Sequence, residues 1–561
     1  MDEPGPSVPG GMRLMPDKSA RLVAGGSVLV GGSPVRVLRL TPAGARQVRS
    51  WFAGAPVPSG AGARTLARRL LDAGIAHPDF AGSGVPPGAF SGAFPGADDV
   101  TVVIPVRDRH AELDRCLTGL RGHARVIVVD DASQDPVAVK RIAAARGAAV
   151  IHRPVNGGPG AARNTGLRAA GTEFVAFLDS DCVPRPGWLA NLLPHFADPA
   201  VGAVAPRIVP HEHGTGWLAR YEGASSTLDM GARPSVVRPG ARVSYVPGAA
   251  LVVRKAAAGD GFRDGMYVGE DVDFVWRMAA AGWRVRYEPR AAMGHDHRVT
   301  FRAWFSRRAD YGTSAAALEE LHPGSVRPLY ASWWTVGAWA AVLAGRPVTA
   351  VALTVAATAL LSRRLARVTG ERWPVPAMGD NSKTRARRRT LGVIVDSCAR
   401  YRAHNYPLSG PTPDNSNWRS APAQDNSNRR PAGTAADGDK HQSAVPPAEG
   451  AAWALALRLA GGGTVAAGRP LGSALSRTWW PVAVPAALAV RRLRLPVAAL
   501  ILAPPLLDWA GRKPPLDPAR YVAARLLDDA AYSLGVWQGC LARRTLRPLL
   551  PVVGGKRQAA R

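Results

Sequence analysis

Short apolar runs alternate with amphipathic stretches between residues 99 and 180, and this alternation predicts the main fold. Runs with the length and the Val, Ile and Phe content of buried strands lie at 100–106, 124–129, 150–151 and 174–178. Stretches with helical spacing lie at 111–120, 137–145 and 159–170. Strands that alternate with helices in this way form βαβ units, so we predict an α/β domain with a mostly parallel sheet over 99–325.

A smaller pattern precedes this domain. Residues 28–30 and 35–40 read as two strands of a hairpin that turns at 31–34, Thr41 and Pro42 open a helix, and a second helix is expected at 63–73. This order resembles the small winged-helix-like (PqqD-like) modules that bind leader peptides in peptide natural-product pathways. We therefore predict such a module at 21–82, with a packing domain that binds no ligand as the alternative. Gly and Pro dominate the flanks, which favours a flexible tail at 1–20 and a linker at 83–98.

Long apolar stretches replace the alternation beyond residue 325. They lie at 329–345, 347–361 and 479–510, with arginines close by. The first two are each slightly short for a membrane span of about 20 residues, so a tight hairpin, or one span plus an interfacial segment, fits better. We predict a membrane-associated segment at 326–373, a disordered insertion at 374–450 and an apolar, basic helical region at 451–561. Helices of a soluble core are the alternative for both apolar regions.

Composition narrows the class of protein. Lys and Arg outnumber Asp and Glu by 71 to 42 in 561 residues, a formal net charge of +29. Such an excess suits nucleic acid, anionic lipid or phosphorylated ligands. However, Arg is spread through the whole chain together with Ala, Gly and Pro, which favours compositional bias and membrane-facing charge, and we expect no nucleic-acid partner. The four cysteines lie far apart, which argues against a disulfide framework and a structural zinc site.

The N-terminus lacks the apolar core of a signal peptide, so the α/β domain is expected on the cytoplasmic side of the cell membrane. The arginines that follow the apolar stretch at 347–361 agree with this orientation, because such residues favour the cytoplasmic surface.

Candidate functional residues lie where the predicted strands end. The strand that begins at Phe174 runs into Asp179-Ser180-Asp181. Along a strand, Asp179 and Asp181 would point to the same side. Two such carboxylates suit a divalent cation, Mg²⁺ or Mn²⁺, that also binds phosphate oxygens. Ligands of parallel sheets bind at this edge, so the pair is a candidate metal site.

Three further motifs precede this pair. A buried strand meets Pro105 and Arg107, which leaves backbone groups free for a nucleotide base. Another strand ends in Asp130 and Asp131, either of which can accept from a base or a ribose, or cap a helix. A Gly-rich turn at 156–164 lets backbone and Arg approach a diphosphate. Its candidate contacts are Gly158, Arg163 and Asn164.

The order Ile-Pro-Val, Val-Asp-Asp-x-Ser, Asn-x-Gly-x-x-x-Ala-Arg-Asn-x-Gly and Leu-Asp-x-Asp resembles the family 2 glycosyltransferases of the GT-A fold. The resemblance implies a Rossmann-like nucleotide-sugar-binding domain, a nucleoside-diphosphate sugar donor, a divalent cation and inversion at the anomeric carbon. It assigns the base or ribose to Asp131. It assigns the metal that bridges the diphosphate to Asp179 and Asp181.

The same resemblance draws attention to the Glu-Asp pair at 270–271. Family members place a base there, so Asp271 is expected to take the proton of the acceptor hydroxyl, with Glu270 as an orienting neighbour. Family members also supply a histidine further on as a metal or diphosphate contact. We expect His295 in that role and keep His297 as the close alternative. A solvated helix start and structural histidines are the alternatives without function.

A winged-helix-like module, a GT-A domain and apolar helices, in this order, resemble the glycosyltransferases of actinobacterial mycofactocin systems. The implied reaction transfers glucose from UDP-glucose, repeatedly and with β-1,4 linkage, to a peptide-derived precursor. Two alternatives stay open: a polyprenyl lipid or cell-wall glycan as the acceptor, and a basic binding protein without enzymatic activity. A nucleotidylyltransferase is disfavoured, because Val103-Ile104-Pro105 stands where such enzymes carry a Gly-rich, lysine-bearing start.

Overall fold

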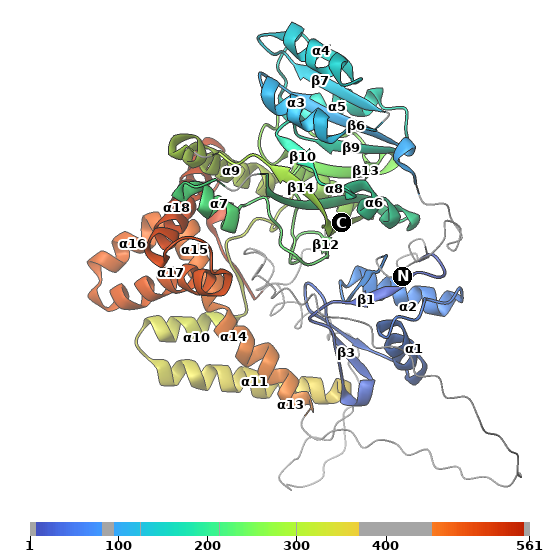
Figure 1. Cartoon of the computed structure of the whole chain (residues 1–561). Coiled ribbons are helices and arrows are strands. Elements are labelled where there is room, and N and C mark those ends of the chain that lie inside the picture. The colour runs from blue at the N-terminus through green and yellow to red at the C-terminus, as the bar shows by residue number, and fades with distance from the viewer. Residues whose placement is uncertain are drawn as a thin grey trace, which may run out of the picture.

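A front module, a central α/β domain and a group of C-terminal helices make up the chain (Figure 1). The structure is a computed structural model that describes residues 7–80, 95–123, 125–211, 214–298, 300–369 and 451–554. The predicted insertion at 374–450 and most of the predicted linker at 83–98 lie outside the described residues.

The front module contains the predicted hairpin and both predicted helices. Strands β2 (Arg21–Val23), β3 (Val28–Gly31) and β4 (Arg36–Arg39) form an antiparallel sheet in which Val28 pairs with Arg39. The helices are α1 (Pro42–Phe52) and α2 (Ala61–Asp72). Thr41 caps α1, because its Oγ1 accepts a hydrogen bond from the Gly44 amide at 3.1 Å. The winged-helix-like classification of the module stays a prediction.

The prediction of a flexible tail is wrong from Val8 onward. Strand β1 (Leu14–Pro16) pairs antiparallel with β5 (Ala76–Pro78), and Val8 and Met12 lie in the core of the module. Three well-spaced apolar side chains among Gly and Pro are enough to anchor this segment, because β5 offers it an edge for backbone pairing. The module therefore begins before residue 21.

The parallel half of the central sheet agrees with the sequence prediction. It consists of β6 (Val100–Val106), β7 (Val126–Asp131), β8 (Ala149–Arg153) and β9 (Phe174–Leu178). The helices that connect these strands are α3 (His110–Gly119), α4 (Pro136–Ala145) and α5 (Gly158–Ala169). Neighbouring residues such as Val102 and Val103 belong to different apolar clusters, so both faces of this half are buried.

Beyond β9 the sheet becomes mixed. Strand β13 (Ala250–Arg254) runs antiparallel to β9, and the order continues through β11 (Val201–Pro210) and β14 (Arg284–His295) to β10 (Cys182–Pro184). Strand β12 (Ser235–Val237) pairs with β14. The helices of this half are α6 (Trp188–Leu192), α7 (Trp217–Ser225), α8 (Glu270–Ala280) and α9 (Phe301–Leu321).

The apolar segment after residue 326 forms a helical hairpin. Helix α10 (Trp333–Leu343) packs beside α11 (Pro347–Thr369), and the chain turns before Pro347, as the sequence predicts. The helices of the C-terminal region are α13 (Ala451–Ala456), α14 (Gly462–Ala466), α15 (Gly468–Arg477), α16 (Trp480–Ala489), α17 (Arg491–Arg512) and α18 (Pro518–Ala542). A short parallel pair, β15 (Tyr330–Ala331) with β16 (Val552–Val553), joins the start of the hairpin to the end of the described chain.

Helix α18 lies directly against α9 of the central domain. A Cβ on Gly312 would stand 2.1 Å from the Tyr532 carbonyl oxygen, and one on Gly535 would stand 1.8 Å from the Ala309 carbonyl oxygen. Backbones this close leave no room for a side chain, so only glycine fits at these two positions. The C-terminal region is therefore built onto the central domain.

The front module docks on the central domain through buried charges. Arg68 of α2 donates to both oxygens of Asp198, at 2.8 and 2.6 Å, and Arg286 lies 3.9 Å from the same carboxylate. Burial raises the pKa of Asp198, but Arg68 and Arg286 lower it more, so the pKa lies below its ordinary value. Arg284 and Asp72 form a second pair at 3.0 Å.

Replacement of Arg68 by alanine is expected to destabilise the protein by about 3 to 5 kcal/mol, because it leaves Asp198 buried without its bidentate partner. Thermal unfolding followed by circular dichroism measures the effect. The exposed neighbour Arg69 provides the control, since Arg69→Ala breaks no buried pair. Equal unfolding midpoints for the two variants would contradict the assigned role of the Arg68–Asp198 pair.

Candidate active site

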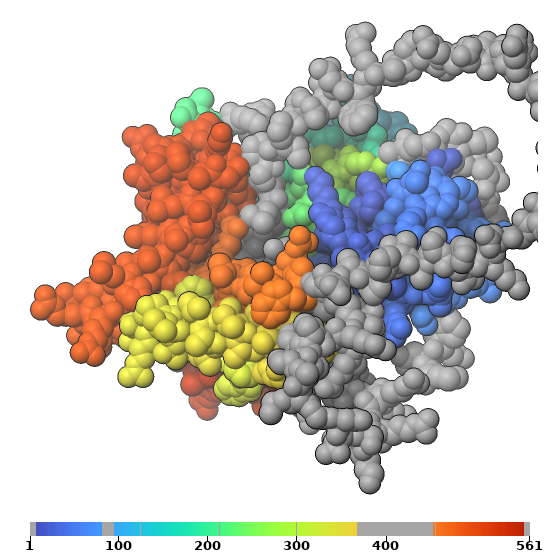
Figure 2. All heavy atoms as spheres, turned by 90° about the horizontal axis from the view of Figure 1, so that it is seen from below, coloured from blue at the N-terminus to red at the C-terminus, as the bar shows by residue number. Residues whose placement is uncertain are grey.

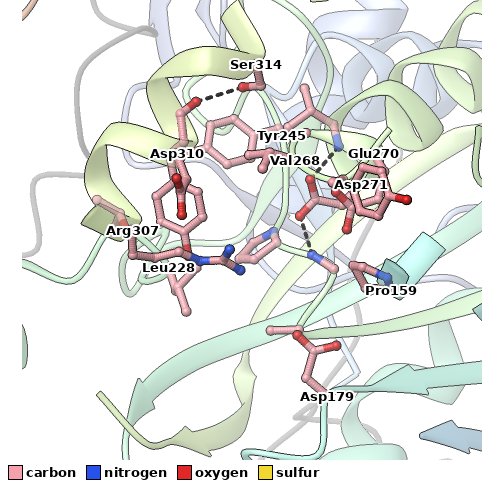
Figure 3. A pocket seen from close by; sticks show the side chains of 18 of the residues that line it. Pro159, Asp179, Leu228, Tyr245, Val268, Glu270, Asp271, Arg307, Asp310 and Ser314 are labelled. Atoms are coloured by element: carbon pink, nitrogen blue, oxygen red, sulfur yellow. Dashed lines mark hydrogen bonds between the residues drawn. The ribbon is translucent and has the colours of Figure 1, made fainter. Parts of the chain in front are cut away.

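A cavity of about 1070 Å³ opens at the carboxyl edge of the parallel strands (Figure 3). It runs from the ends of β6, β7 and β9 past the start of α8 and along α9 to α15 and α18. Ten predicted site residues line it: Pro105, Arg107, Asp131, Gly158, Arg163, Asp179, Asp181, Glu270, Asp271 and His295. The alternative His297 lines it as well. The sequence motifs thus converge on one space.

Two predicted site residues do not line this cavity. Asp130 is buried below it, where its carboxylate accepts from the Ser133 amide at 3.0 Å and lies 2.8 Å from His152 Nδ1. The side-chain amide of Asn164 is tied to the backbone of Phe262: its Nδ2 donates to the Phe262 carbonyl at 2.7 Å, and its Oδ1 accepts from the Phe262 amide at 2.8 Å. Both side chains hold the loops around the cavity, and the structure does not bring them to its surface.

Asp131 organises the Gly-rich turn. Its carboxylate accepts from the amides of Gly157 at 3.1 Å and Gly158 at 2.8 Å, and from Arg153 at 2.5 Å. Gly158 has a positive φ of 82°, and a Cβ there would stand 2.7 Å from the ring of Tyr267. A carboxylate at this place presents a charged, hydrogen-bonding edge to the cavity while it shapes the turn.

Arg163 joins two acidic parts of the site. One of its nitrogens donates to Asp179 Oδ1 at 2.6 Å, and another donates to Glu270 Oε1 at 3.0 Å. Burial opposes the charge of Arg163, yet Asp179 and Glu270 raise its pKa above the ordinary value. The cation is therefore permanent. It holds the end of β9 and the start of α8 at a fixed separation.

The Asp-x-Asp segment is a turn and does not extend the strand. Strand β9 ends at Leu178, and the Cys182 amide donates to the Asp179 carbonyl at 3.0 Å. The argument from alternating strand positions is therefore wrong, because the Asp179 amide still pairs with the Ala249 carbonyl at 2.9 Å and the chain turns between Asp179 and Cys182. Both carboxylates still line the cavity, as does Ser180 between them.

Asp181 lies between two basic side chains. Arg109 pairs with its Oδ2, and His295 Nε2 lies 3.6 Å from its Oδ1. Burial raises the pKa of Asp181, but His295 and Arg109 lower it more, so the pKa lies below its ordinary value. Among the described residues, the buried Oδ1 atom has no hydrogen-bond donor. An ionised, under-satisfied oxygen of this kind is a good ligand for a cation.

The donor set fits a metal that takes few protein ligands. In the described part of the chain, no three His, Cys, Asp or Glu side chains gather into a closed cage. Mg²⁺ commonly uses one or two carboxylates and completes its shell with water and substrate phosphate. Asp181 and Asp179 match that requirement. His295 Nε2 lies 3.6 Å from Asp181, whereas His297 Nδ1 lies 3.8 Å from Glu222.

Glu270 and Asp271 begin α8 at the centre of the cavity (Figure 3). The Gly248 amide donates to Asp271 Oδ2 at 2.7 Å, and the Val272 amide donates to Oδ1 at 2.8 Å. Burial raises the pKa of Asp271 despite these bonds. Burial and the charge of Asp271 raise the pKa of Glu270 to about 7. Two acids with raised pKa values in one cavity are typical of proton-transfer sites.

Further cavity-lining side chains come from places that no sequence motif marks. Arg307 on α9 extends toward the interior of the cavity, across the view in Figure 3 from Glu270 and Asp271. Its guanidinium lies over the ring of Tyr311 at 5.0 Å. Arg298 lines the same region. The only possible signal is the arginine-rich start of α9, because the fold alone decides which of these side chains faces the cavity.

The segment 242–248 connects the front module with Asp271. The Arg242 amide donates to Ser33 Oγ, and its guanidinium lies 3.3 Å from Asp17 Oδ2. At the other end of the segment, Gly248 holds Asp271. The front module thus supports one wall of the cavity from outside. None of its described residues lines the cavity itself.

Comparison with known proteins identifies the family of the chain. Residues 101–258 match the model of glycosyl transferase family 2. The pre-mycofactocin glycosyltransferase of Mycobacterium tuberculosis is 37% identical over 563 residues, which cover 97% of this chain and 98% of the relative. The succinoglycan biosynthesis protein ExoW of Rhizobium meliloti is 41% identical over 102 residues, 16% of this chain and 32% of that protein.

Among solved structures, the mannosyltransferase PcManGT from Pyrobaculum calidifontis, in complex with GDP-Man and Mn²⁺, has 23% identity and a TM-score of 0.32. The match covers 48% of this chain and 79% of the mannosyltransferase chain.

The sequence relatives define an enzyme of the glycosyltransferase class. The chain belongs to family 2 and, over nearly its full length, to the pre-mycofactocin glycosyltransferases within it. The prediction of the family and the prediction of an enzyme are both confirmed.

Proposed function

We propose that the protein transfers glucose from UDP-glucose to a peptide-derived mycofactocin precursor, with inversion at the anomeric carbon. The observation that carries the proposal is the position of Asp271, held by Gly248 in the same cavity as Asp131, Asp179 and Asp181. The relative that matches nearly the full chain is called a pre-mycofactocin glycosyltransferase, which supports the choice of acceptor.

The reaction is a single displacement. The acceptor hydroxyl oxygen attacks C1 of the donor sugar, and its proton passes to the carboxylate of Asp271. The bond between C1 and the diphosphate oxygen breaks, and the electron pair leaves with the nucleoside diphosphate. Attack from the side opposite the leaving group inverts C1, which turns an α-linked donor into a β-linked product. Glu270 keeps Arg163, and with it the start of α8, in place for this step.

The donor occupies the end of the cavity formed by the parallel strands. Pro105 and Asp131 line the place of the base and ribose, while Arg163, Arg298 and Arg307 offer positive charge to the diphosphate. Asp179 and Asp181 would hold a divalent cation, with His295 beside them. When bound, such a cation neutralises charge that develops on the leaving diphosphate. Repeated transfer to the growing product would give the proposed β-1,4-linked glucose chain.

The test is an assay of the full-length protein with a panel of UDP- and GDP-sugars, with and without Mg²⁺ or Mn²⁺. Released nucleotide is quantified, and products formed on a precursor extract are identified by mass spectrometry. We expect UDP release with UDP-glucose and products heavier by successive hexose units. A chain that turns over no donor would contradict the proposal, and hexose on an isoprenoid lipid would favour the polyprenyl alternative.

We further propose that the protein works at the membrane surface. Among the described residues, two helices are apolar and long enough to cross a membrane, Pro347–Ala366 and Arg491–Arg512, with only 22% and 17% of their apolar windows buried. Figure 2 shows α10 and α11 (yellow) beside the C-terminal helices (orange to red), and α11 and α13 also pack on β3 of the front module (blue) through Leu365, Ala366 and Ala456. Exposed apolar surface of this extent suits contact with lipid.

Combined replacement of Val348, Val351 and Val355 by glutamate is expected to reduce cosedimentation with anionic liposomes at least tenfold. These side chains are 81%, 63% and 54% exposed on one face of α11, so charge there opposes entry into lipid without loss of core packing. The control is Val137→Glu on α4 of the central domain, where valine is 74% exposed. Unchanged sedimentation of the triple variant would exclude α11 as the contact.

A further inference from the structure

The end of the cavity opposite the nucleotide motifs is formed by chain segments far apart in sequence. Its lining comes from α9, from residues 325–328 and from helices α15 and α18. Gly269, just before Glu270 and Asp271, connects the two ends: a Cβ there would lie 2.9 Å from Ser314 and 3.3 Å from Leu318 of α9. The expected base thus stands between the nucleotide end and this C-terminal end of the cavity.

An apolar wall covers part of the C-terminal end. Leu318 and Ala315 of α9, Ala474 of α15 and Val536 of α18 are buried side chains that line the cavity. Val326 packs against the apolar cluster that contains Leu318 and against the cluster that contains Ala315 and Val536, so it links the α9 and α18 parts of the wall. Polar positions interrupt it around its rim. They are Ser325, Arg327, Ser473, Arg477 and Thr478.

A stacked pair faces the cavity next to this wall. The guanidinium carbon of Arg477 lies 3.9 Å from the centre of the Tyr532 ring, and Asp529 accepts from Arg477 at 3.5 Å. Both Arg477 and Tyr532 line the cavity. Because the ion pair with buried Asp529 fixes the guanidinium, the stack presents a rigid flat surface. Flat groups such as aromatic rings, or the apolar face of a sugar ring, pack well on surfaces of this kind.

We propose that the C-terminal end of the cavity is the acceptor subsite and that the Arg477–Tyr532 stack binds a ring of a compact acceptor. This inference rests on the proposed function, since it assumes that the nucleotide sugar occupies the opposite end. An isoprenoid chain fits poorly, because it needs an unbroken apolar groove and meets the Arg477–Asp529 and Arg327–Glu319 ion pairs instead. Tyr532 and Arg477 are therefore determinants of acceptor specificity.

Binding of a soluble ring-bearing probe, p-nitrophenyl β-D-glucoside, to the full-length protein loaded with UDP tests the subsite by calorimetry. We expect Tyr532→Leu to weaken binding of the glucoside about three- to tenfold, the effect of losing one ring stack. Tyr532→Phe keeps the ring and should bind the glucoside like the wild type. Arg477→Lys keeps the charge opposite Asp529 but loses the planar stack, so it should also bind more weakly. Binding of UDP should stay the same in all variants.

Several results would overturn the subsite. The first is that the wild type does not bind the glucoside. The second is that the wild type and Tyr532→Leu bind the glucoside equally well. The third is that the wild type binds farnesyl phosphate more tightly than the glucoside. Unfolding midpoints, compared for all variants, show whether a weaker variant is still folded, and Arg477→Lys, which removes the planar stack while Tyr532 stays in place, keeps the series decisive if Tyr532→Leu is unstable. Failure of the proposed function is distinguishable, because it appears as missing turnover of UDP-glucose in the wild type while the binding series still decides the subsite.

Discussion

Asp271→Asn is expected to lower kcat for sugar transfer by about 10²- to 10⁴-fold, with little change in the affinity for UDP. Asparagine keeps the hydrogen bond from the Gly248 amide to a side-chain oxygen, so the loop geometry survives while the proton acceptor is lost. Initial rates of UDP release with saturating donor and acceptor measure the effect. The control is Asp264→Asn, an exposed carboxylate in the loop before α8. A variant that keeps more than a tenth of the activity would exclude Asp271 as the base.

The pH dependence of kcat/KM gives an independent test of the same residue. The base must be ionised, so activity is expected to rise with pH and then level off. Because burial raises the pKa of Asp271, this rise should fall at a higher pH than an ordinary aspartate would give. Glu270→Gln removes a neighbouring negative charge, and the rise should then move to lower pH. A rise that stays in place in Glu270→Gln would contradict the electrostatic coupling of the pair.

Arg163→Leu is expected to destabilise the protein by about 3 to 5 kcal/mol at neutral pH and to abolish transfer. The substitution leaves the carboxylates of Asp179 and Glu270 without the buried cation that both contact. Urea unfolding and UDP release measure the two effects. Arg168→Leu, an exposed position on the same helix, is the matched control. Equal stability of the two variants would show that the Arg163 bridge contributes nothing.

The loss of stability in Arg163→Leu should itself depend on pH. Arg163 lowers the pKa of Glu270, so its removal raises that pKa above about 7. A carboxyl whose folded pKa exceeds its unfolded pKa stabilises the fold below the unfolded value, and this contribution disappears as the pH rises through the folded value. The variant should therefore approach wild-type stability near pH 4 and fall furthest behind above pH 7.

Local patterns were sufficient for much of the fold. Strand β6 has the predicted bounds, and the connecting helices α3, α4 and α5 begin and end within two residues of prediction, because apolar runs and helix starts are local signals. The cap at Thr41 is equally local. Local patterns could not predict that residues 8–20 are structured. Their structure depends on pairing with β5, which lies more than 50 residues further along the chain.

In the candidate site, too, local patterns predicted some features, whereas others depend on the packing of distant segments. One cavity is lined by four of the predicted aspartates, Asp131, Asp179, Asp181 and Asp271. Parallel strands end at one edge of a sheet, and ligands bind there. The partners of each acid were not predictable. Asp130 and Asn164 have the residue types of ligand contacts, yet the structure uses both to hold loops. Arg307 and Tyr532 reach the cavity only through the packing of α9 and α18.

The glycine contact between α9 and α18 has a consequence for how the enzyme is made. Gly312 and Gly535 are separated by more than 200 residues of chain. They must nevertheless meet before α18 can form its part of the cavity wall. A ribosome that has just synthesised Asp271 has therefore produced the carboxylates of the candidate site before the helices that complete the cavity wall. A premature stop codon between Asp271 and α18 would therefore yield a chain that carries these acids but lacks the part of the cavity wall that α18 provides.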